Sequence, residues 1–478
     1  MTSLQARPVS GPDLPDGPDD GLDGAIIELT LGAVAHGGHC VSRHDGRVVF
    51  VRHALPGETV RALVTEQHSS FLRADAVEIL DASPRRVAPP CPWAGPGLGN
   101  ADGAPRAKVG PGHAHGAPRA KFCGGCDLQH ADLAYQRELK TAVLREQLVR
   151  LGGLDESTVD RLAPVVRPLP AVPGEPDGQG WRTRVQYTVD STGRAGLLAH
   201  RSHEVVGVDR CLIAHAAVRD TDVLRRDWPD HGVDREHRGP RARGASASEP
   251  RRREQRDAVA SRHVIEVVAG EPSTVLARRA DASPAVVSGP ETVTERAVGR
   301  SWRLPPTAFW QVHPSAADTL AAAVVELLAP RPGDRIWDLY GGVGLFAAAL
   351  APHADATGRI TVVEGDAAAA AAARECLRDL TTVTVVHADV AKALRNARWR
   401  AVDLVVLDPP RSGAGPQVVA AVAARGPRAV AYVACDPAAL ARDIRTFRSF
   451  GYELTVLRAY DLFPHTHHLE AVALLTTA

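Results

Sequence analysis

The chain has 478 residues, which predicts two or three domains, and 44% of them are apolar, enough to build sizeable cores. Acidic and basic residues balance, so the formal net charge is zero and any surface for nucleic acid has to be local. No apolar run reaches the length of a membrane span, so we expect no membrane contact. Seven cysteines at uneven spacing, with no signal peptide ahead of them, favour a reducing, cytoplasmic location and cysteines that bind metal or react.

The first part of the chain predicts a small β module. Residues 1–21 are rich in Pro, Gly and Asp, which is typical of a disordered tail. Short β-like runs follow in residues 22–86, and strands at this spacing predict a small barrel, with a purely structural module as the simpler interpretation. If the barrel is one of those that bind nucleic-acid strands, basic and aromatic side chains would make the contacts. Four candidates for such contacts, each of which would by default be an ordinary surface or core residue, are Arg52, Arg61, Phe71 and Arg73.

A C-x-x-C pair, Cys123 and Cys126, places two thiolates on one tight turn. A redox disulfide is the alternative, but no thioredoxin-like βαβ pattern surrounds the pair. Because two thiolates do not complete a tetrahedral site, we expect two more ligands, and Cys91 and Cys211 are the candidates. Soft thiolates suit zinc or an iron–sulfur cluster, and the residues alone do not choose between them.

Residues 87–306 predict a central α+β domain with two low-complexity insertions. The apolar side chains of Asp132–Leu151 fall on one side of an amphipathic helix, and residues 181–215 alternate like short strands. The insertions, 94–120 and 230–262, are predicted to be flexible. A basic arm that touches RNA is the weaker alternative for the second insertion.

From residue 307 to residue 478, strands and helices alternate. This pattern predicts a doubly wound, mostly parallel sheet with ligands at the carboxyl ends of its strands. Seven strands are expected, near 336–340, 360–364, 383–387, 402–407, 428–434, 452–458 and 470–476.

The first of these strands runs into a glycine-rich turn, and an alanine-rich helix follows. Gly342 and Gly344 let the backbone approach a ligand closely, and the helix N-terminus favours polar or negative groups. Glu364, at the end of the next strand, can accept both ribose hydroxyls of a nucleoside cofactor. The turn also fits the dinucleotide fingerprint of a dehydrogenase, so the turn alone does not identify which cofactor binds.

Later strand ends carry candidate catalytic groups. Two prolines after Asp408 aim its carboxylate into the cleft. Cys435 precedes a predicted N-cap, Asp436, and a helix N-terminus favours a thiolate, which makes this cysteine a candidate nucleophile. Glu470 opens the last strand and faces either the cleft or the solvent. The three histidines before it suggest a metal site or a solvated loop.

Four phrases in this half, in this order, resemble the uracil-5 RNA methyltransferase family: 338–346, 407–413, 435–443 and 463–470. The phrase Phe309–Pro314 is similar to another of that family's motifs, with His313 in place of an asparagine. Further upstream, 48–51 and 54–58 resemble the RNA-binding TRAM domain. The cysteines that match the iron–sulfur ligands of the branch that methylates large-subunit ribosomal RNA are Cys91, Cys123, Cys126 and Cys211.

The resemblance implies an α/β fold with a class I Rossmann-like methyltransferase domain at 307–478, an OB-like TRAM barrel at 22–86 and a cluster-bearing central domain. It implies S-adenosylmethionine and a 4Fe-4S cluster as cofactors, and a uridine of 23S ribosomal RNA as substrate, with tRNA as the alternative. We expect a monomer. For cofactor and base binding it implies Gln311, Tyr340, Gly342, Gly344, Glu364, Asp389 and Asp408, with Cys435 as nucleophile and Glu470 as base.

The chemistry of uracil agrees with these roles. Carbon 5 is a weak nucleophile until a thiolate adds to carbon 6, and a carboxylate must then remove the carbon 5 proton before the thiol can leave. The uridine must also be unstacked. Three alternatives stay open: a dehydrogenase, which leaves Cys435 unexplained; a non-catalytic iron–sulfur RNA-binding protein, which needs no cofactor cleft; and, nearest, a cytosine-5 methyltransferase.

Overall fold

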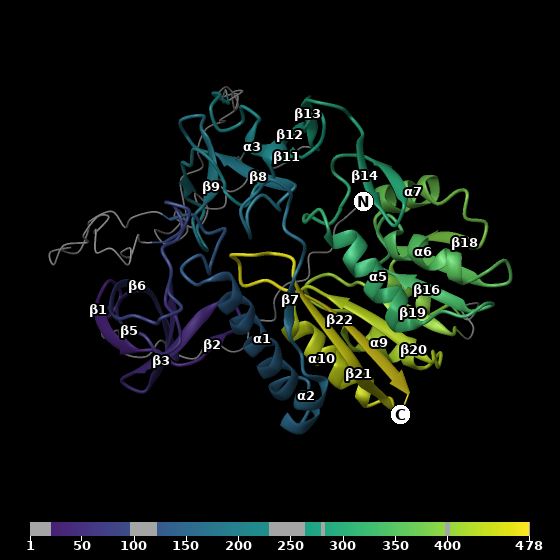
Figure 1. Cartoon of the computed structure of the whole chain (residues 1–478), viewed down its shortest axis with the longest axis horizontal. Coiled ribbons are helices and arrows are strands. Elements are labelled where there is room, and N and C mark those ends of the chain that lie inside the picture. Colours follow the sequence, from purple (N-terminus) through teal and green to yellow (C-terminus); the bar gives the residue numbers. More distant parts are fainter. Residues whose placement is uncertain (1–20, 96–121, 229–262, 279–282, 397–401, 478) are drawn as a thin grey trace, which may run out of the picture. The chain divides into compact units, whose positions relative to one another are not determined.

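The computed structural model describes residues 21–95, 122–228, 263–278, 283–396 and 402–477 (Figure 1). The predictions for the N-terminal tail and the two insertions fall almost wholly outside these residues. The described chain divides into two compact units, one ending at Ala88 and the other starting at Pro89. A boundary at residue 306 within the second unit stays a prediction. Among the described residues, no helix combines the length and apolar character needed to cross a membrane.

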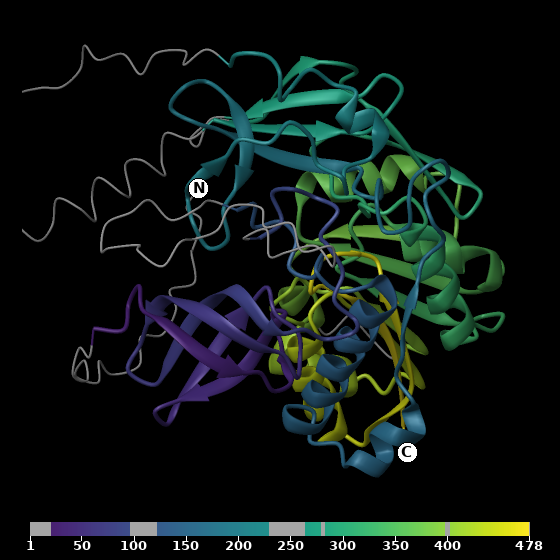
Figure 2. The ribbon, with the colours of Figure 1, turned by 60° about the vertical axis from the view of Figure 1, so that its left-hand side comes forward.

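The first unit is one six-stranded sheet in the order β1-β5-β6-β4-β3-β2, coiled around its own core (Figure 2). Alternate residues of β5 point into that core, where Val60, Ala62 and Val64 are fully buried. The sequence did not predict β2 and β3, since β2 has two residues and β3 carries two histidines and an arginine. The strands are β1 Ile26–Thr30, β2 Val34–Ala35, β3 His39–His44, β4 Arg47–Arg52, β5 Thr59–Gln67 and β6 Phe71–Asp81.

Where the structure describes it, the amino-terminal part of the second unit contains a second six-stranded sheet, a hairpin and three helices. The predicted amphipathic helix is confirmed as α1, Leu133–Arg150, with Asp132 as its N-cap. Two shorter helices are α2, Glu156–Leu162, and α3, Ala216–Arg219. The sheet order is β10-β9-β8-β11-β12-β13, and β14 pairs with β15. The strands are β8 Arg184–Val189, β9 Ala195–Leu198, β10 Val205–Val206, β11 Val264–Val268, β12 Thr274–Arg278, β13 Ala285–Ser288, β14 Val293–Ala297 and β15 Arg300–Leu304.

The rest of the second unit is built on an eight-stranded sheet in the order β18-β17-β16-β19-β20-β22-β21-β7. All seven predicted strands are present, and β22 runs antiparallel between β20 and β21. The eighth strand, β7, comes from the predicted central domain and pairs in parallel with the end of β21. Its three residues are too few to show a period. The strands are β7 Val166–Pro168, β16 Arg335–Leu339, β17 Arg359–Glu364, β18 Val383–His387, β19 Leu404–Leu407, β20 Ala429–Ala434, β21 Tyr452–Asp461 and β22 Glu470–Thr477.

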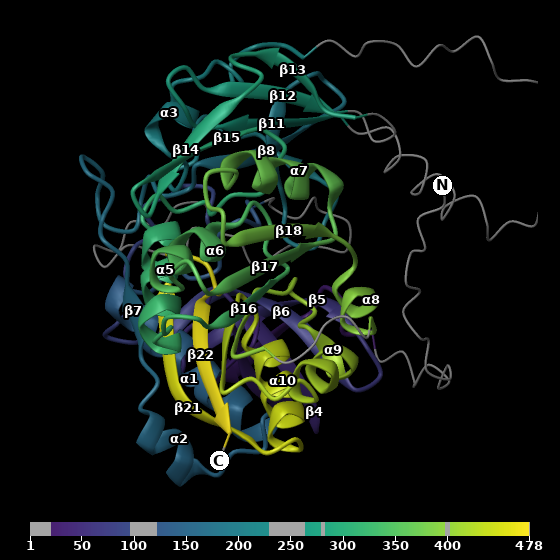
Figure 3. The ribbon, with the colours of Figure 1, turned by 90° about the vertical axis from the view of Figure 1, so that its right-hand side faces the viewer.

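Helices cover both faces of this sheet (Figure 3). Successive residues of β19 enter opposite cores, because Leu404 and Val406 pack with α5, α6 and α7, whereas Val405 and Leu407 pack with α8, α9, α10 and α1. Burial on both faces explains why β19 and β20 are continuous apolar runs in the sequence. The helices are α5 Ala316–Leu328, α6 Leu345–Leu350, α7 Ala367–Cys376, α8 Val390–Leu394, α9 Gly415–Ala423 and α10 Pro437–Arg448.

A buried ion pair joins α1 to the end of β21. Lys140 Nζ lies 2.5 Å from Asp461 Oδ1 and also donates to the backbone oxygen of Phe463 at 3.1 Å. Both charged side chains are only 1% exposed. Burial lowers the pKa of Lys140, and the charge of Asp461 opposes that effect. Each charge therefore depends on its partner, which ties the helix to the sheet.

Removing one partner should be more damaging than removing both. We expect Asp461→Ala to lower the free energy of unfolding by about 3–5 kcal/mol, because it leaves the Lys140 ammonium buried and unpaired. The double variant Lys140→Met, Asp461→Leu should recover much of that loss, as measured by chemical denaturation. Glu375→Ala, which breaks an exposed pair with Arg378, is the control and should change stability little. A double variant as unstable as the single one would contradict this account.

Candidate active site

The glycine turn after β16 requires its glycines. Gly342 and Gly344 have φ values of 53° and 84°, in the left-handed region that favours glycine. A Cβ on Gly344 would lie 2.4 Å from Leu377 Cδ1, and one on Gly341 would lie 2.5 Å from Val362 Cγ1. The turn is therefore packed closely against its neighbours and can present its backbone to a ligand.

The predicted cofactor acids lie around this turn. Glu364, at the end of β17, accepts from Gly342 N at 2.8 Å and from Asp366 N at 2.6 Å, so its carboxylate is held against the turn. Asp389 is the N-cap of α8 and accepts from Lys392 N at 2.9 Å. Burial, together with the charges of Asp389 and Asp443, raises the pKa of Tyr340 to about 12. Tyr340 is therefore a neutral hydroxyl between the turn and α8.

Gln311 is partly exposed, and its amide makes no hydrogen bond to the described residues. Phe309, two residues earlier, is 69% exposed, which is unusual for so large an apolar side chain. Nothing in the sequence alone assigned Phe309 a role. Its place in the same short phrase as Gln311 is the signal that could have singled it out.

Two acids at neighbouring strand ends are poorly solvated. Asp338 is fully buried, and its Oδ2 accepts from Ala347 N at 3.0 Å. Burial raises the pKa of Asp338 to about 7, and the charge of Glu364 adds to the effect. Burial and the charges of Asp338 and Glu364 also raise the pKa of Asp408 to about 7. Near neutral pH a positive ligand would favour the ionised form of both groups.

Cys435 lies where the sequence predicted, between β20 and α10, and Asp436 caps the helix by accepting from Ala439 N at 2.8 Å. The expectation that the helix N-terminus stabilises a thiolate is wrong for the free site. Burial raises the pKa of the Cys435 thiol to about 11, with the charge of Glu470 as the next cause. The Arg411 guanidinium opposes both effects. Burial, together with the nearby carboxylates of Glu470, Asp408 and Asp436, outweighs the weak partial charge of one helix end.

The structure decides the orientation of Glu470. Its side chain is in the molecule's interior, with the residue 4% exposed. Burial and the charge of Asp408 hold the pKa of Glu470 well above its usual range, and Arg411 works against them. Cys435, Asp408, Glu470 and Arg411 therefore lie close enough to act on one another electrostatically. Arg411 stands in a phrase that the sequence analysis quoted without giving it a role.

A second residue that the sequence analysis missed, Asp443, shapes the loop after Asp408. Its Oδ2 accepts from the Tyr432 hydroxyl at 2.5 Å and from Ala414 N at 2.7 Å. A Cβ on Gly413 would lie 2.7 Å from the same oxygen. Asp443, on α10, thus fixes the course of the segment that carries Arg411.

The three histidines before Glu470 do not lie in a fully solvated loop, since His465 is buried and His467 and His468 are half-buried. Among the described residues, they belong to no group of three potential metal ligands. His465 is 5% exposed, and burial lowers its pKa to about 4. His467 Nδ1 lies 2.6 Å from Asp127 Oδ2, and the backbone N–H groups of Asp127 and Leu128 both donate to His465 O at 2.9 Å. The turn that follows Cys126 therefore holds the loop that leads to Glu470.

The four predicted metal ligands come from three separate segments and lie near one another. All four are free thiols. Burial raises the pKa of Cys126 well above its usual range, and the charges of Cys211, Cys123 and Cys91 add to this. Within the described residues, no three Cys, His, Asp or Glu side chains are already drawn together as a site for a single metal ion. A Cβ on Gly124 would lie 2.5 Å from His200 N, so the turn between Cys123 and Cys126 packs directly on the neighbouring chain.

The doubly wound sheet carries a glycine turn after β16 and, two strands along, Cys435 within electrostatic reach of Asp408 and Glu470. This arrangement is typical of Rossmann-like group-transfer enzymes. Residues 292–478 match the tRNA (Uracil-5-)-methyltransferase family, and residues 22–77 match the TRAM domain. An RNA methyltransferase of Streptomyces avermitilis is 44% identical over 462 residues, which cover 95% of this chain and 99% of that protein. The 23S rRNA (uracil(1939)-C(5))-methyltransferase RlmD of Alkalilimnicola ehrlichii is 32% identical over 475 residues, which cover 94% of this chain and 96% of that one.

Among solved structures, the fold is similar to that of the Pyrococcus abyssi tRNA (uracil-54, C5)-methyltransferase in complex with S-adenosyl-L-homocysteine. The TM-score is 0.60 at 20% identity, over 94% of this chain and 99% of that one. The chain belongs to the uracil-5 RNA methyltransferase family, as its sequence phrases predicted.

The electrostatic account of Cys435 can be tested by alkylation of the free protein. With a pKa of about 11, only about one thiol in a thousand is ionised at pH 8, so iodoacetamide should react slowly and faster as the pH rises. Glu470→Gln removes a nearby negative charge and should move the curve of alkylation rate against pH to lower pH. Mass spectrometry of the peptide that contains Cys435 measures the rate.

Glu453→Gln, an exposed acid on β21 that pairs with Arg448, is the matched control and should leave the curve unchanged. A wild-type midpoint at or below that of a free cysteine, about 8.5, would contradict the assignment.

Proposed function

We propose that this protein transfers a methyl group from S-adenosylmethionine to carbon 5 of a uridine in RNA, through a covalent bond between Cys435 and carbon 6. The observation that supports this most directly is the convergence of Cys435 and the buried Glu470 at neighbouring strand ends, where each changes the other's electrostatics. A dehydrogenase or a non-catalytic RNA-binding protein has no use for this pair.

The residues around the glycine turn are suited to hold the cofactor. Gly342 and Gly344 allow close approach of the backbone, and Glu364 is placed for ribose hydroxyls. Gln311, Tyr340 and Asp389 offer further polar groups. When bound, S-adenosylmethionine supplies an electrophilic methyl group on a positively charged sulfur. The related Pyrococcus enzyme was solved with the demethylated product of this cofactor, which supports the assignment.

Cys435 and Glu470 act at opposite ends of one covalent cycle. The Cys435 sulfur forms a bond to carbon 6, and the electron pair released onto carbon 5 takes up the methyl group. Glu470 then accepts the carbon 5 proton, and the electrons of that C–H bond re-form the carbon 5–carbon 6 double bond as the sulfur–carbon bond breaks. A carboxylate with a raised pKa is a stronger base than an ordinary one, which suits Glu470 for this step. Arg411 favours the thiolate form that attack requires.

Asp408 is the candidate for recognition of the base. An ionised carboxylate at this strand end would accept the N3–H of uracil and repel the N3 lone pair of cytosine. This hypothesis favours uridine over the cytosine-5 alternative. Transfer to cytidine and to uridine at similar rates in short RNAs would disprove it.

We place the substrate uridine in 23S ribosomal RNA, in the cytoplasm, and take the protein to act as a monomer. The full-length match to a 23S rRNA enzyme supports this choice over tRNA. In the TRAM unit, Phe50 and Phe71 pack edge to face at 5.8 Å, His68 stacks on Phe71 at 4.2 Å, and the Arg73 guanidinium lies over both phenylalanine rings. Aromatic and cationic groups gathered in this way suit stacking with unpaired bases. Of the other two candidates, Arg61 is paired with Glu78 at 2.7 Å, and Arg52 lies 3.8 Å from Asp75.

We also propose that Cys91, Cys123, Cys126 and Cys211 hold a 4Fe-4S cluster. The donor set fits, because four free thiols of raised pKa lie within electrostatic reach of one another and a positive metal centre would stabilise their thiolate forms. A four-iron cluster is wider than one ion, so its ligands stand further apart than those of a single metal site. Through Asp127 the cluster would also stabilise the loop that carries Glu470.

The covalent cycle predicts different failures for its two side chains. Cys435→Ala should form no adduct and transfer no methyl group. Glu470→Gln should still attack and methylate but stall before release, so it should accumulate a methylated RNA–protein adduct that survives a denaturing gel. The measurement uses radiolabelled S-adenosylmethionine and RNA from a strain that lacks this gene.

Position mapping of 5-methyluridine in that RNA identifies the substrate, and a product in tRNA would replace the 23S assignment. Wild-type turnover by Glu470→Gln without an adduct would exclude Glu470 as the base. Methylation by Cys435→Ala would exclude the covalent mechanism.

The cluster proposal predicts that protein purified without air is brown and carries about four irons. Cys123→Ala should lose the colour and the iron and lower the melting temperature of the second unit. Cys376→Ala, a half-buried thiol outside this set, is the control and should keep the iron. Stoichiometric zinc without iron would overturn the cluster assignment.

A further inference from the structure

One buried carboxylate of the second unit has neither an ion pair nor a part in the proposed chemistry. Asp443 is 4% exposed, and the donors to its Oδ2 are all neutral: the Tyr432 hydroxyl at 2.5 Å, Ala414 N at 2.7 Å and Gly415 N at 3.2 Å. A buried carboxylate without a cation costs free energy that a neutral side chain of the same size would avoid, so the groups that it holds in place are informative. Every other buried acid in the described part of the chain either has a basic partner, as do Glu58, Asp334 and Asp461, or belongs to the candidate active site, as do Asp338 and Glu470.

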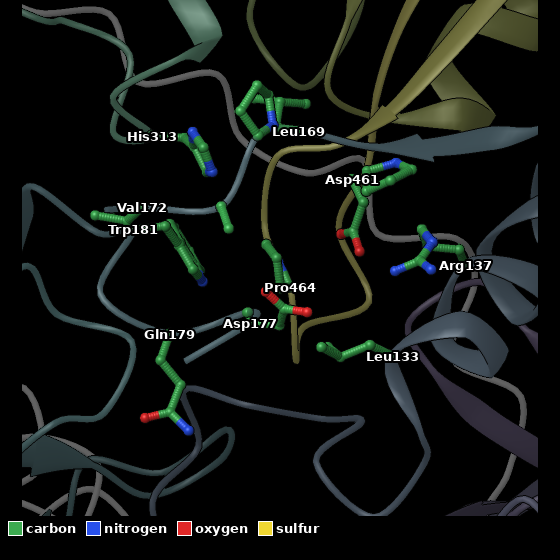
Figure 4. Close-up of a pocket in the computed structure, with 14 residues that line it drawn as sticks. Leu133, Arg137, Leu169, Val172, Asp177, Gln179, Trp181, His313, Asp461 and Pro464 are labelled. Atoms are coloured by element: carbon green, nitrogen blue, oxygen red, sulfur yellow. The ribbon is translucent and has the colours of Figure 1, made fainter. Parts of the chain in front are cut away.

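Asp461 is a buried acid whose position is explained by an ion pair. It lines a cleft of about 300 Å³, with Arg137 on the same side and Trp181 and His313 opposite (Figure 4). Trp181 and His313 are 3% and 4% exposed, so their rings are closed to a ligand and we assign none to this cleft. Lys140 Nζ, 2.5 Å from Asp461 Oδ1, accounts for the burial of the acid. Asp461 therefore needs no further role.

Asp443 caps a helix to which it does not belong. Helix α9 begins at Gly415 after Ala414, whose methyl side chain cannot accept a hydrogen bond. Helices commonly begin with a Ser, Thr, Asp or Asn side chain that accepts from their first N–H groups. Asp443 replaces that local cap, because its carboxylate accepts from both Ala414 N and Gly415 N. The partial positive charge at the N-terminus of α9 also favours a negative group here.

The same carboxylate fixes the loop that leads from β19 to α9, residues 408–414. Gly413 has a φ of 88°, and a Cβ there would lie 2.7 Å from Asp443 Oδ2, so the loop touches α10. The Tyr432 hydroxyl, on the buried strand β20, also accepts from Ala414 N at 3.0 Å. The end of the loop is therefore held between β20 and α10.

Arg411 depends on this loop for its position. Its side chain is exposed and makes no hydrogen bond or ion pair with the described residues, so the course of its backbone sets where the guanidinium lies. Burial raises the pKa of Cys435 and of Glu470, and the Arg411 guanidinium opposes that rise in both. A displaced loop would therefore change the electrostatics of both proposed catalytic side chains.

Helix α10 connects the loop to the proposed nucleophile. Cys435 immediately precedes Asp436, the N-cap of α10, and Asp443 lies about two turns further along the same helix. We propose that Asp443 is a positioning residue, which holds the loop of residues 408–414 against α10 so that Arg411 keeps its place near Cys435. The proposal rests on Cys435 being the nucleophile of the proposed reaction.

The test measures how strongly Arg411 acts on Cys435 with and without Asp443. In the wild-type background, Arg411→Gln should slow alkylation of Cys435 by iodoacetamide at pH 8 about threefold, because the guanidinium favours the thiolate. In the Asp443→Ala background, the same change should slow alkylation by less than about 1.5-fold, since Arg411 is no longer held in place. Each comparison is made within one background, so the lost charge of Asp443 itself cancels.

Two further variants keep the test decisive where Asp443→Ala folds poorly. Asp443→Asn retains an oxygen that can accept from Ala414 N, so it should keep most of the wild-type effect of Arg411→Gln. Tyr432→Phe removes one donor to Asp443 and one acceptor for Ala414 N, so it should reduce that effect.

Tyr452→Phe is the matched control for Tyr432→Phe, because the hydroxyl of that buried tyrosine donates to Pro427 O at 2.7 Å, before the start of β20. It should lower the melting temperature and leave the effect of Arg411→Gln unchanged. An equal effect of Arg411→Gln in wild type, Asp443→Ala and Tyr432→Phe would overturn the proposal. A reduction in Tyr452→Phe, or an Asp443→Asn variant as impaired as Asp443→Ala, would also overturn it.

Methyl transfer provides a second measurement. In single-turnover reactions at saturating RNA and S-adenosylmethionine, Asp443→Ala should be about ten- to hundredfold slower, because a small displacement of a charged group near the reacting atoms is costly. Its affinity for S-adenosylmethionine should stay within about twofold of wild type, and an equal loss of cofactor affinity would contradict a positioning role. The alkylation comparison uses neither RNA nor cofactor, so failure of uridine methylation and failure of this proposal appear in different assays.

Discussion

The contacts between the turn after Cys126 and the loop before Glu470 join the cysteine-bearing part of the second unit to its catalytic sheet. Two backbone N–H groups donate to His465 O, and the Asp127 carboxylate meets His467. The buried pair of Lys140 with Asp461 anchors the same loop at its other end. Because the loop is held at both ends by residues more than 300 positions away, the position of Glu470, the proposed general base, depends on the central part of the chain.

The acidic side chains of the candidate active site repel one another electrostatically, and this repulsion is part of how the site works. Asp338, Asp408 and Glu470 are all poorly solvated. Beyond burial, the charge of Asp338 raises the pKa of Asp408, and the charge of Asp408 raises the pKa of Glu470. Such a cluster costs stability in the free protein, as is common for sites arranged for chemistry. Binding of a positively charged cofactor relieves the repulsion, so cofactor binding and ionisation of these acids should be coupled.

Most of the fold could be predicted from local patterns in the sequence. The alternation of apolar strands and helices predicted all seven strands of the catalytic sheet. The glycines of the turn could also be recognised, because glycine is the residue that tolerates close packing and positive φ, and the structure has both at this turn. Pattern reasoning also placed Cys435 and Glu470 at strand ends. It could not place β7, whose three residues have no period and pair only because β21 lies beside them.

What the sequence could not predict depends on long-range contacts. The helix N-terminus suggested a stabilised thiolate at Cys435, but burial of the thiol outweighs it, and Glu470 and Asp408, which add to the effect, come from other strands. The buried position of His465 and the ion pair of His467 depend on Gln136 and Asp127, more than 300 residues earlier. Trp181 and Arg137 show nothing in the sequence that marks them as neighbours of one cleft, because the turns that bring them together are irregular.

The position of β22 constrains how the sheet is assembled. This strand is made after β21, yet it lies between β21 and β20 and pairs with both. During synthesis, β20 and β21 are therefore available before the strand that joins them, and each leaves a row of backbone N–H and C=O groups open until β22 arrives. Insertion of β22 completes the sheet and delivers Glu470 to the site in the same event. A chain that has not finished folding would thus hold Cys435, the proposed nucleophile, without Glu470, the proposed base.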